Sequence, residues 1–110
     1  MAFDVVLTPG FKKDLKHIAK KHKQILQDLN ILIDKLMSNP TMGTDLGQGI
    51  YKIRLPISGT NKGKSSGARI ITYVIFINEV VYLSEIYLKN EFDTVDITNV
   101  LARLKDGGII

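Results

Sequence analysis

The stretch GIYKIRLPISGTNKGKSSGARIIT, residues 49–72, combines two strand-like runs with a concentration of positive charge. Residues 50–57 alternate between apolar side chains and the cations Lys52 and Arg54, which predicts a β-strand with one apolar and one basic face. Residues 68–77 are rich in Ile, Val and aromatic side chains and predict the next strand. Because the two runs are close in sequence, we expect them to pair as an antiparallel hairpin.

Charge in this part of the chain has a single sign. Between residues 46 and 78 the sequence contains no Asp or Glu. Arg69 adds a third cation to the two strands, and Lys62 and Lys64 lie in the loop that joins them. Fixed cations on a sheet beside a cationic loop suit a polyanion such as RNA or DNA.

The length and composition indicate an ordinary globular protein. The 110 residues suffice for one domain, residues 1–110, with its own core. The net charge is +4, and the absence of cysteine excludes disulfides and thiolate metal sites. The N-terminus lacks a signal-peptide pattern, and no apolar run approaches the roughly 20 residues of a membrane helix. We therefore expect a cytoplasmic protein with no membrane partner.

The N-terminal part predicts one strand and two helices. Residues 3–7 form a short apolar run, and Thr8 followed by a proline is typical of a helix N-cap. Apolar residues then recur at helical spacing in two segments, and an Asn-Pro pair at residues 39–40 ends the second. Only a short polar stretch separates the segments, so we expect an antiparallel helical hairpin. A glycine-containing loop at residues 41–49 follows it.

The C-terminal part predicts one more strand and one more helix. Asn78 and Glu79 indicate a tight turn into a strand at residues 80–88, and apolar spacing predicts an amphipathic helix at residues 94–105. The expected order is β-α-α-β-β-β-α, an α+β fold in which the helical hairpin packs on a mostly antiparallel four-stranded sheet. The basic face of that sheet would be open or only partly covered.

Four segments of the chain carry a resemblance to a known family. They are FKKDLKHIAKKH (residues 11–22), SNPTMGTDLGQGIYKIRL (38–55), KGKSSGARIITYV (62–74) and VYLSEIYLKNE (81–91). In this order the chain resembles the RelE/ParE toxin superfamily of bacterial toxin–antitoxin modules, and most closely the RelE/HigB-like branch with a longer basic loop. The resemblance covers the whole chain and implies the RelE-like microbial RNase-type fold.

The resemblance also implies a function. Such toxins enter the ribosomal A site and cut the mRNA there, without a metal ion or other cofactor, and a cognate antitoxin holds them inactive. The implied partners are therefore the antitoxin protein, the ribosome and mRNA. The positions that match the catalytic residues of the family are all basic: Lys52, Arg54, Lys64, Arg69 and Lys89.

Three further residues are candidates for RNA binding. Lys62 matches the basic loop of the family. Tyr73 and Tyr87 would offer rings for stacking on bases, although tyrosines in strands more often pack within the sheet. The chain departs from some relatives at two positions, because Asn90 stands where they have arginine and no tyrosine occurs near Asp96. Tyr73 and Tyr87 are the possible substitutes in proton transfer.

Metal-free RNA cleavage uses the 2′-OH as the nucleophile on the adjacent phosphate. Arg54 and Arg69 suit a phosphate clamp, because a guanidinium binds phosphate bidentately and stays charged. Lys52 or Lys64, desolvated among other cations, would exchange protons with the reacting oxygens.

Two other functions remain open. A ParE-like protein poisons DNA gyrase without cutting nucleic acid, and the same fold supports it. A catalytically degenerate homologue would bind RNA or its antitoxin only, an alternative that the two departures from the family pattern keep open. The basic set on the two strands favours RNA cleavage over gyrase poisoning.

Other polar residues receive structural interpretations. His17 and His22 are five residues apart, about 140° around a helix, which argues against a two-histidine nuclease. Glu91, Asp93 and Asp96 match no metal-ligand pattern and instead suit the start of the last helix. The lysines of the first helix are either a solvated face or a contact for ribosomal RNA.

Overall fold

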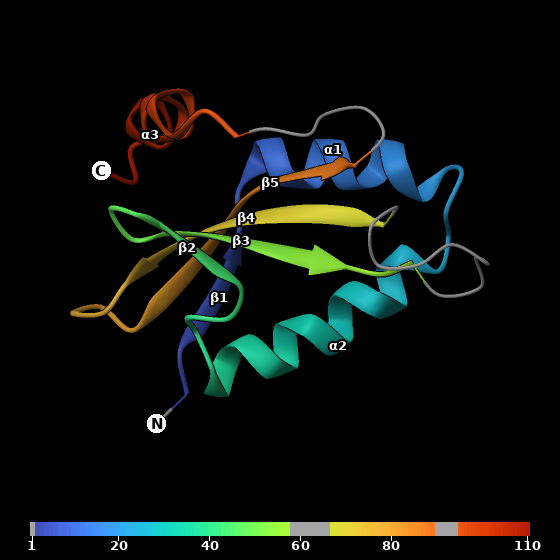
Figure 1. Cartoon of the computed structure of the whole chain (residues 1–110), viewed down its shortest axis with the longest axis horizontal. Coiled ribbons are helices and arrows are strands. Elements are labelled where there is room, and N and C mark those ends of the chain that lie inside the picture. The colour runs from blue at the N-terminus through green and yellow to red at the C-terminus, as the bar shows by residue number, and fades with distance from the viewer. Residues whose placement is uncertain (1, 58–66, 90–94) are drawn as a thin grey trace.

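The computed structural model describes residues 2–57, 67–89 and 95–110. Figure 1 shows a sheet with helices on both of its sides. The elements are β1 (Asp4–Leu7), α1 (Pro9–Ala19), α2 (Ile25–Ser38), β2 (Thr44–Gly47), β3 (Ile50–Leu55), β4 (Ala68–Ile75), β5 (Val80–Leu88) and α3 (Ile97–Asp106). The expected α+β class and the order of the long elements are confirmed.

Within the described residues, the sheet has five strands in the order β1-β5-β4-β3-β2. Strand β1 runs parallel to β5, and every other pair is antiparallel. The expected count of four strands is wrong, because residues 44–47 form the edge strand β2 within the segment expected to be a loop. The sequence TDLG is short and exposed and carries no β-branched or aromatic alternation, so its pairing depends on β3 rather than on propensity.

A glycine allows this edge strand to form. Gly43 has φ +95°, and a Cβ at this position would lie 2.3 Å from the carbonyl oxygen of Lys52. Only glycine permits both the left-handed backbone and such a close approach of two strands. The turn that follows β2 also contains left-handed backbone, at Gln48 and Gly49.

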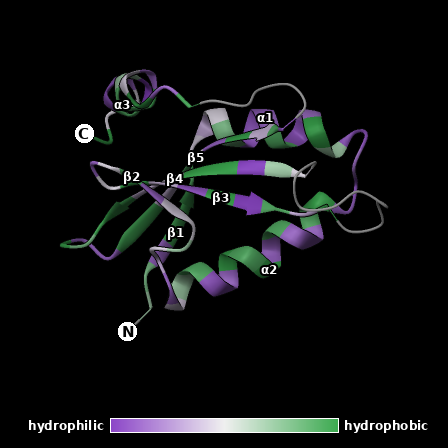
Figure 2. Cartoon of the chain, in the orientation of Figure 1, coloured by the Kyte–Doolittle hydropathy of each residue, from purple (hydrophilic) through white to green (hydrophobic). Residues whose placement is uncertain are grey.

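Helices α1 and α2 share one hydrophobic core with one face of the sheet. Phe11 and Ile25 are fully buried in it, together with Ile53 and Leu83 from the strands. Figure 2 shows α2 alternating between hydrophobic and hydrophilic residues, as a helix with one buried face must. Within the described ranges, no helix is long and apolar enough to cross a membrane.

The predicted helix start at Thr8 is confirmed, and it also joins α1 to the sheet. The Thr8 side chain accepts a hydrogen bond from the N–H of Phe11 at 3.3 Å. Its hydroxyl donates to the carbonyl oxygen of Leu83 at 3.0 Å, in β5. The cap therefore fixes where α1 begins relative to the strand that it covers.

Helix α3 packs on the opposite face of the sheet from α1 and α2, which we call the α3 face. Val100 and Leu104 are buried there against Ile50 and Ile71, and Figure 1 shows α3 and α2 on opposite sides of the strands. The helix begins at Ile97 rather than at residue 94, where it was expected. Asp96 is its N-cap, since its carboxylate accepts a hydrogen bond from the N–H of Thr98 at 3.0 Å. The proposed capping residues Glu91 and Asp93 lie outside the described residues.

Strands β3 and β4 end two residues earlier than expected. Strand β4 stops at Ile75, and a turn at residues 76–79 leads into β5. The N–H of Glu79 donates to the carbonyl oxygen of Phe76 at 3.1 Å, and Glu79 has φ +53°. The sequence predicted Ile77 as a strand residue because it is apolar, but it lies in this turn and is 93% exposed.

A β-bulge in β5 decides which of its side chains face which side. Ile71 pairs with Glu85, whereas the next residue, Thr72, pairs with Leu83, so Ser84 is the extra residue. Because of this insertion, Leu83 and Ile86 both lie in the core under α1 and α2. Without it, residues three positions apart would lie on opposite faces of the sheet.

The bulge leaves a buried hydroxyl for which the described part of the chain provides no partner. The Oγ1 atom of Thr72 is buried and makes no hydrogen bond there, and Thr72 faces the same core as its neighbour Leu83. Replacing the hydroxyl by a methyl group removes a desolvated polar atom and keeps the shape. We expect Thr72→Val to raise the free energy of unfolding by about 1 kcal/mol, measured by urea denaturation.

Thr72→Ser is the matched control. It keeps the hydroxyl and removes the methyl group, so it should lower the free energy of unfolding. If Thr72→Val were instead destabilising by a similar amount, the hydroxyl would have to be hydrogen-bonded in solution.

Candidate functional site

The register of the three central strands aligns two arginines and a tyrosine. Arg54 in β3 lies directly opposite Arg69 in β4, and Arg69 lies opposite Tyr87 in β5. Directly opposite residues share a face of the sheet, and these three lie on the α3 face. We call Arg54, Arg69 and Tyr87 the arginine row. The neighbouring row, Leu55 and Ala68, faces the core under α1 and α2.

The two guanidinium groups of the arginine row differ in exposure. Arg54 is exposed, whereas Arg69 is only 5% exposed and donates from Nη1 to the carbonyl oxygen of Ala68 at 3.2 Å. Tyr87 is half-buried and packs against the apolar residues beneath α3. A ligand on this face would therefore meet Arg54 directly, while Arg69 adds positive charge from within the sheet.

Two lysines flank the arginine row. Lys52 lies two residues before Arg54 on the same strand and the same face, and it is half-buried. Lys89 follows the last residue of β5, and its N–H donates to the carbonyl oxygen of Gly67 at 3.1 Å. Gly67 precedes Arg69 by two residues, so this bond places Lys89 beside the start of β4. The structure thus brings four of the five predicted catalytic residues to one region of the sheet.

Of the other candidates, Tyr73 lies apart from this group. Tyr73 lies on the α3 face but pairs with Ile50 and Tyr82 and packs beneath α3, away from the arginine row. Lys62 and Lys64 lie outside the described residues, as does Asn90. His17 is in α1, whereas His22 lies in the linker before α2, so the two histidines do not share a helix as expected.

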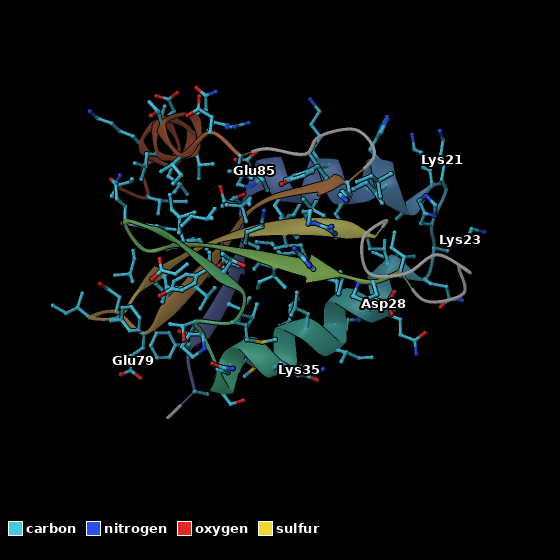
Figure 3. The ribbon with its side chains drawn as sticks, in the orientation of Figure 1. Lys21, Lys23, Asp28, Lys35, Glu79 and Glu85 are labelled. Atoms are coloured by element: carbon cyan, nitrogen blue, oxygen red, sulfur yellow. The ribbon has the colours of Figure 1, made fainter. Side chains whose placement is uncertain are left out.

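One acidic residue interrupts the basic surface. Glu85 lies on the α3 face of β5, in line with Ile71 and Lys52, at the point where β5 passes α1 and α3 (Figure 3). Its Oε1 atom is 3.2 Å from the Nη2 atom of Arg103 in α3. The Oε2 atom is buried and has no hydrogen-bond partner within the described residues.

Burial raises the pKa of Glu85 above its ordinary value of 4.5. The positive charge of Arg103 opposes this shift, and the negative charge of Asp14 in α1 adds to it. Desolvation exceeds the attraction of Arg103 because that guanidinium is 60% exposed and its field is screened by water. No motif in the sequence marks Glu85, although it is the only charged residue within Val80–Leu88.

Glu85 also lines a cavity of about 430 Å³ between α1, β5 and α3. Asp14 and His17 contribute from α1, and Asp96 and Arg103 from α3. Tyr87 of the arginine row lines the same cavity. The cavity and the basic strands therefore adjoin each other at Tyr87.

Comparisons with solved structures show a RelE-like toxin fold. The chain matches a double arginine-to-alanine mutant of the Escherichia coli toxin RelE in the free state, with a TM-score of 0.62, 16% identity, and coverage of 96% of this chain and 97% of that chain. The isolated E. coli RelE toxin matches with a TM-score of 0.60, 15% identity, and coverage of 93% and 97%. No protein-family model and no curated protein sequence matches the chain. The resemblance seen in the sequence is thus confirmed at the level of the fold.

The raised pKa of Glu85 predicts a specific dependence of stability on pH. The folded protein holds the proton of Glu85 more tightly than the unfolded chain does, so the stability contributed by this group is present below pH 4.5 and is lost as the pH rises through the folded-state pKa. Glu85→Gln removes this loss. We expect the unfolding free energy of Glu85→Gln to increase relative to that of the wild type as the pH rises from 4.5 to neutrality.

Urea denaturation over that pH range measures the difference. Glu79→Gln, the same change in the turn before β5, reports the effect of losing one negative charge elsewhere on the chain. If the unfolding free energy of the wild type instead increased relative to that of Glu85→Gln with rising pH, the ion pair with Arg103 would outweigh desolvation.

Proposed function

We propose that this protein is the toxin of a type II toxin–antitoxin module, an endoribonuclease that cuts mRNA on the ribosome. The observation that carries the proposal is the arginine row, in which two arginines lie directly opposite each other on adjacent strands and share one face of the sheet. The RelE-like fold supports the toxin assignment. The reaction and the ribosome dependence are what the resemblance to RelE/HigB-like toxins implies.

The arginine row suits a phosphodiester. A phosphate carries the opposite charge to the two neighbouring arginines, and it would accept hydrogen bonds from Arg54. Because Arg69 is buried in a region of low dielectric, its charge acts on a phosphate at Arg54 more strongly than an exposed charge would. The same field stabilises the additional negative charge of a phosphorane transition state.

The reaction that fits these residues needs no metal. The 2′-oxygen attacks the adjacent phosphorus, the bond to the 5′-oxygen breaks, and a 2′,3′-cyclic phosphate remains. Lys52, half-buried beside Arg54, is the candidate for moving protons at the reacting oxygens. The ribosome would hold the mRNA in the geometry for in-line attack, which accounts for a requirement for ribosomes.

The partners and location follow from this function. A cognate antitoxin would cover the basic surface and neutralise its charge, and the toxin would meet ribosomes and mRNA in the cytoplasm. An antitoxin segment that folds on the toxin surface would combine apolar burial with acidic side chains.

Primer extension on a defined mRNA in a reconstituted translation reaction tests the proposal. The wild type should cut within codons, and only when ribosomes are present. Arg54→Ala should slow cleavage by about 10²-fold, the loss typical of one transition-state donor. Arg69→Lys keeps the buried charge through which Arg69 acts on the phosphate, so it should slow cleavage much less than Arg54→Ala does.

Lys35→Ala, which removes an exposed cation on α2, is the control and should cut as the wild type does. Circular dichroism confirms that each variant is folded. Intact mRNA with folded wild-type protein, or full cleavage by Arg54→Ala, would refute the proposed site.

A further inference from the structure

The cavity between α1, β5 and α3 carries a charge pattern opposite to that of the arginine row. Asp14, Glu85 and Asp96 line it with three carboxylates, against the single guanidinium of Arg103. Asp14 is close enough to Glu85 to raise its pKa, so Arg103 does not neutralise the pair. The cavity therefore has an excess of hydrogen-bond acceptors.

The acceptors on Asp14 and Asp96 are available without unfolding any element. Asp14 is exposed on the side of α1 that lines the cavity. Among the described residues, the hydrogen bond to the Asp96 side chain is the cap of α3 on its Oδ1 atom, and Oδ2 is the oxygen that a ligand would use. Within the described residues, no three His, Asp or Glu side chains form a group that could hold a metal ion. An organic ligand rich in N–H donors fits this lining better than a metal does.

The position of the cavity suggests what that ligand is. It begins at Tyr87, and Arg69 and Arg54 lie on the two adjacent strands, each about 5 Å further across the sheet. A nucleotide has the same polarity over a similar length, with a phosphate at one end and a base at the other. Its phosphate suits the arginines, and its base suits the cavity, where the Tyr87 ring forms part of the wall.

We propose that the cavity between α1, β5 and α3 binds a guanine base of an RNA whose phosphate lies on the arginine row. Guanine is the base whose Watson–Crick edge presents two adjacent donors, N1–H and N2–H₂, which a carboxylate can accept together. Its O6 atom accepts from a guanidinium such as that of Arg103. The other three bases present at most one donor group on this edge. A volume of about 430 Å³ is ample for a purine.

This inference rests on the proposed function for the presence of RNA, but its test does not require cleavage. The probes are fluorescein-labelled trinucleotides UNU, in which N is G, A, C or U and every 2′-oxygen is methylated, so no 2′-OH attack can occur. Fluorescence anisotropy measures their dissociation constants for the full-length protein. We expect UGU to bind about tenfold more tightly than UUU, as one bidentate contact would give.

Asp14→Asn/Asp96→Asn removes two of the three carboxylates. Asn caps a helix as well as Asp does, so α3 keeps its start. We expect the ratio of the UUU and UGU dissociation constants to fall from about tenfold to about twofold or less. Asp4→Asn/Asp34→Asn, two exposed residues that do not line the cavity, removes the same charge and should keep the tenfold ratio.

The ratio of the UUU and UGU dissociation constants tests the guanine site independently of the proposed nuclease activity. Equal binding of all four trinucleotides, or an unchanged ratio in Asp14→Asn/Asp96→Asn, would overturn the guanine site even if mRNA is cut. A guanine preference that depends on these carboxylates would uphold the site even if the protein cuts no mRNA.

Discussion

The β-bulge at Ser84 is the constraint on which both faces of the sheet depend. On the side under α1 and α2, it allows Leu83 and Ile86 to enter one core although they are three residues apart. On the α3 face, it places Glu85 and Tyr87 in line with the cations of β3 and β4. The Thr8 side chain donates to the carbonyl oxygen of Leu83, the residue next to the bulge. The start of α1 is therefore positioned against the bulge in β5.

The α3 face is divided between packing and polar functions. Val100 and Leu104 cover one end of it with apolar contacts, and Tyr73 belongs to that covered end. The other end keeps Lys52 half-buried and Arg54 exposed, beside the buried Arg69. A helix that covers only part of a sheet thus leaves a polar region open beside a dry one, which is the arrangement that a binding surface on a small domain requires.

The sequence predicted the arrangement of the cations better than it predicted the acids. Alternation in residues 50–55 assigned Lys52 and Arg54 to one face, and the structure agrees, because an uninterrupted strand keeps its period of two. Strand β2 was missed because TDLG pairs only through the close approach that Gly43 permits. Glu85 was passed over because its neighbours Asp14 and Arg103 are distant in sequence and meet it only through α1 and α3.

By itself, the sequence determined the types and order of the long elements, their main boundaries and the basic character of one sheet face, since these follow from local periodicity, capping and turn residues. Only the tertiary structure decided the five-stranded order, the exposure of Arg54 against the burial of Arg69, and the acidic cavity beside them. Those properties depend on contacts between residues far apart in the chain. No local pattern specifies which distant residues will exclude water from a given side chain.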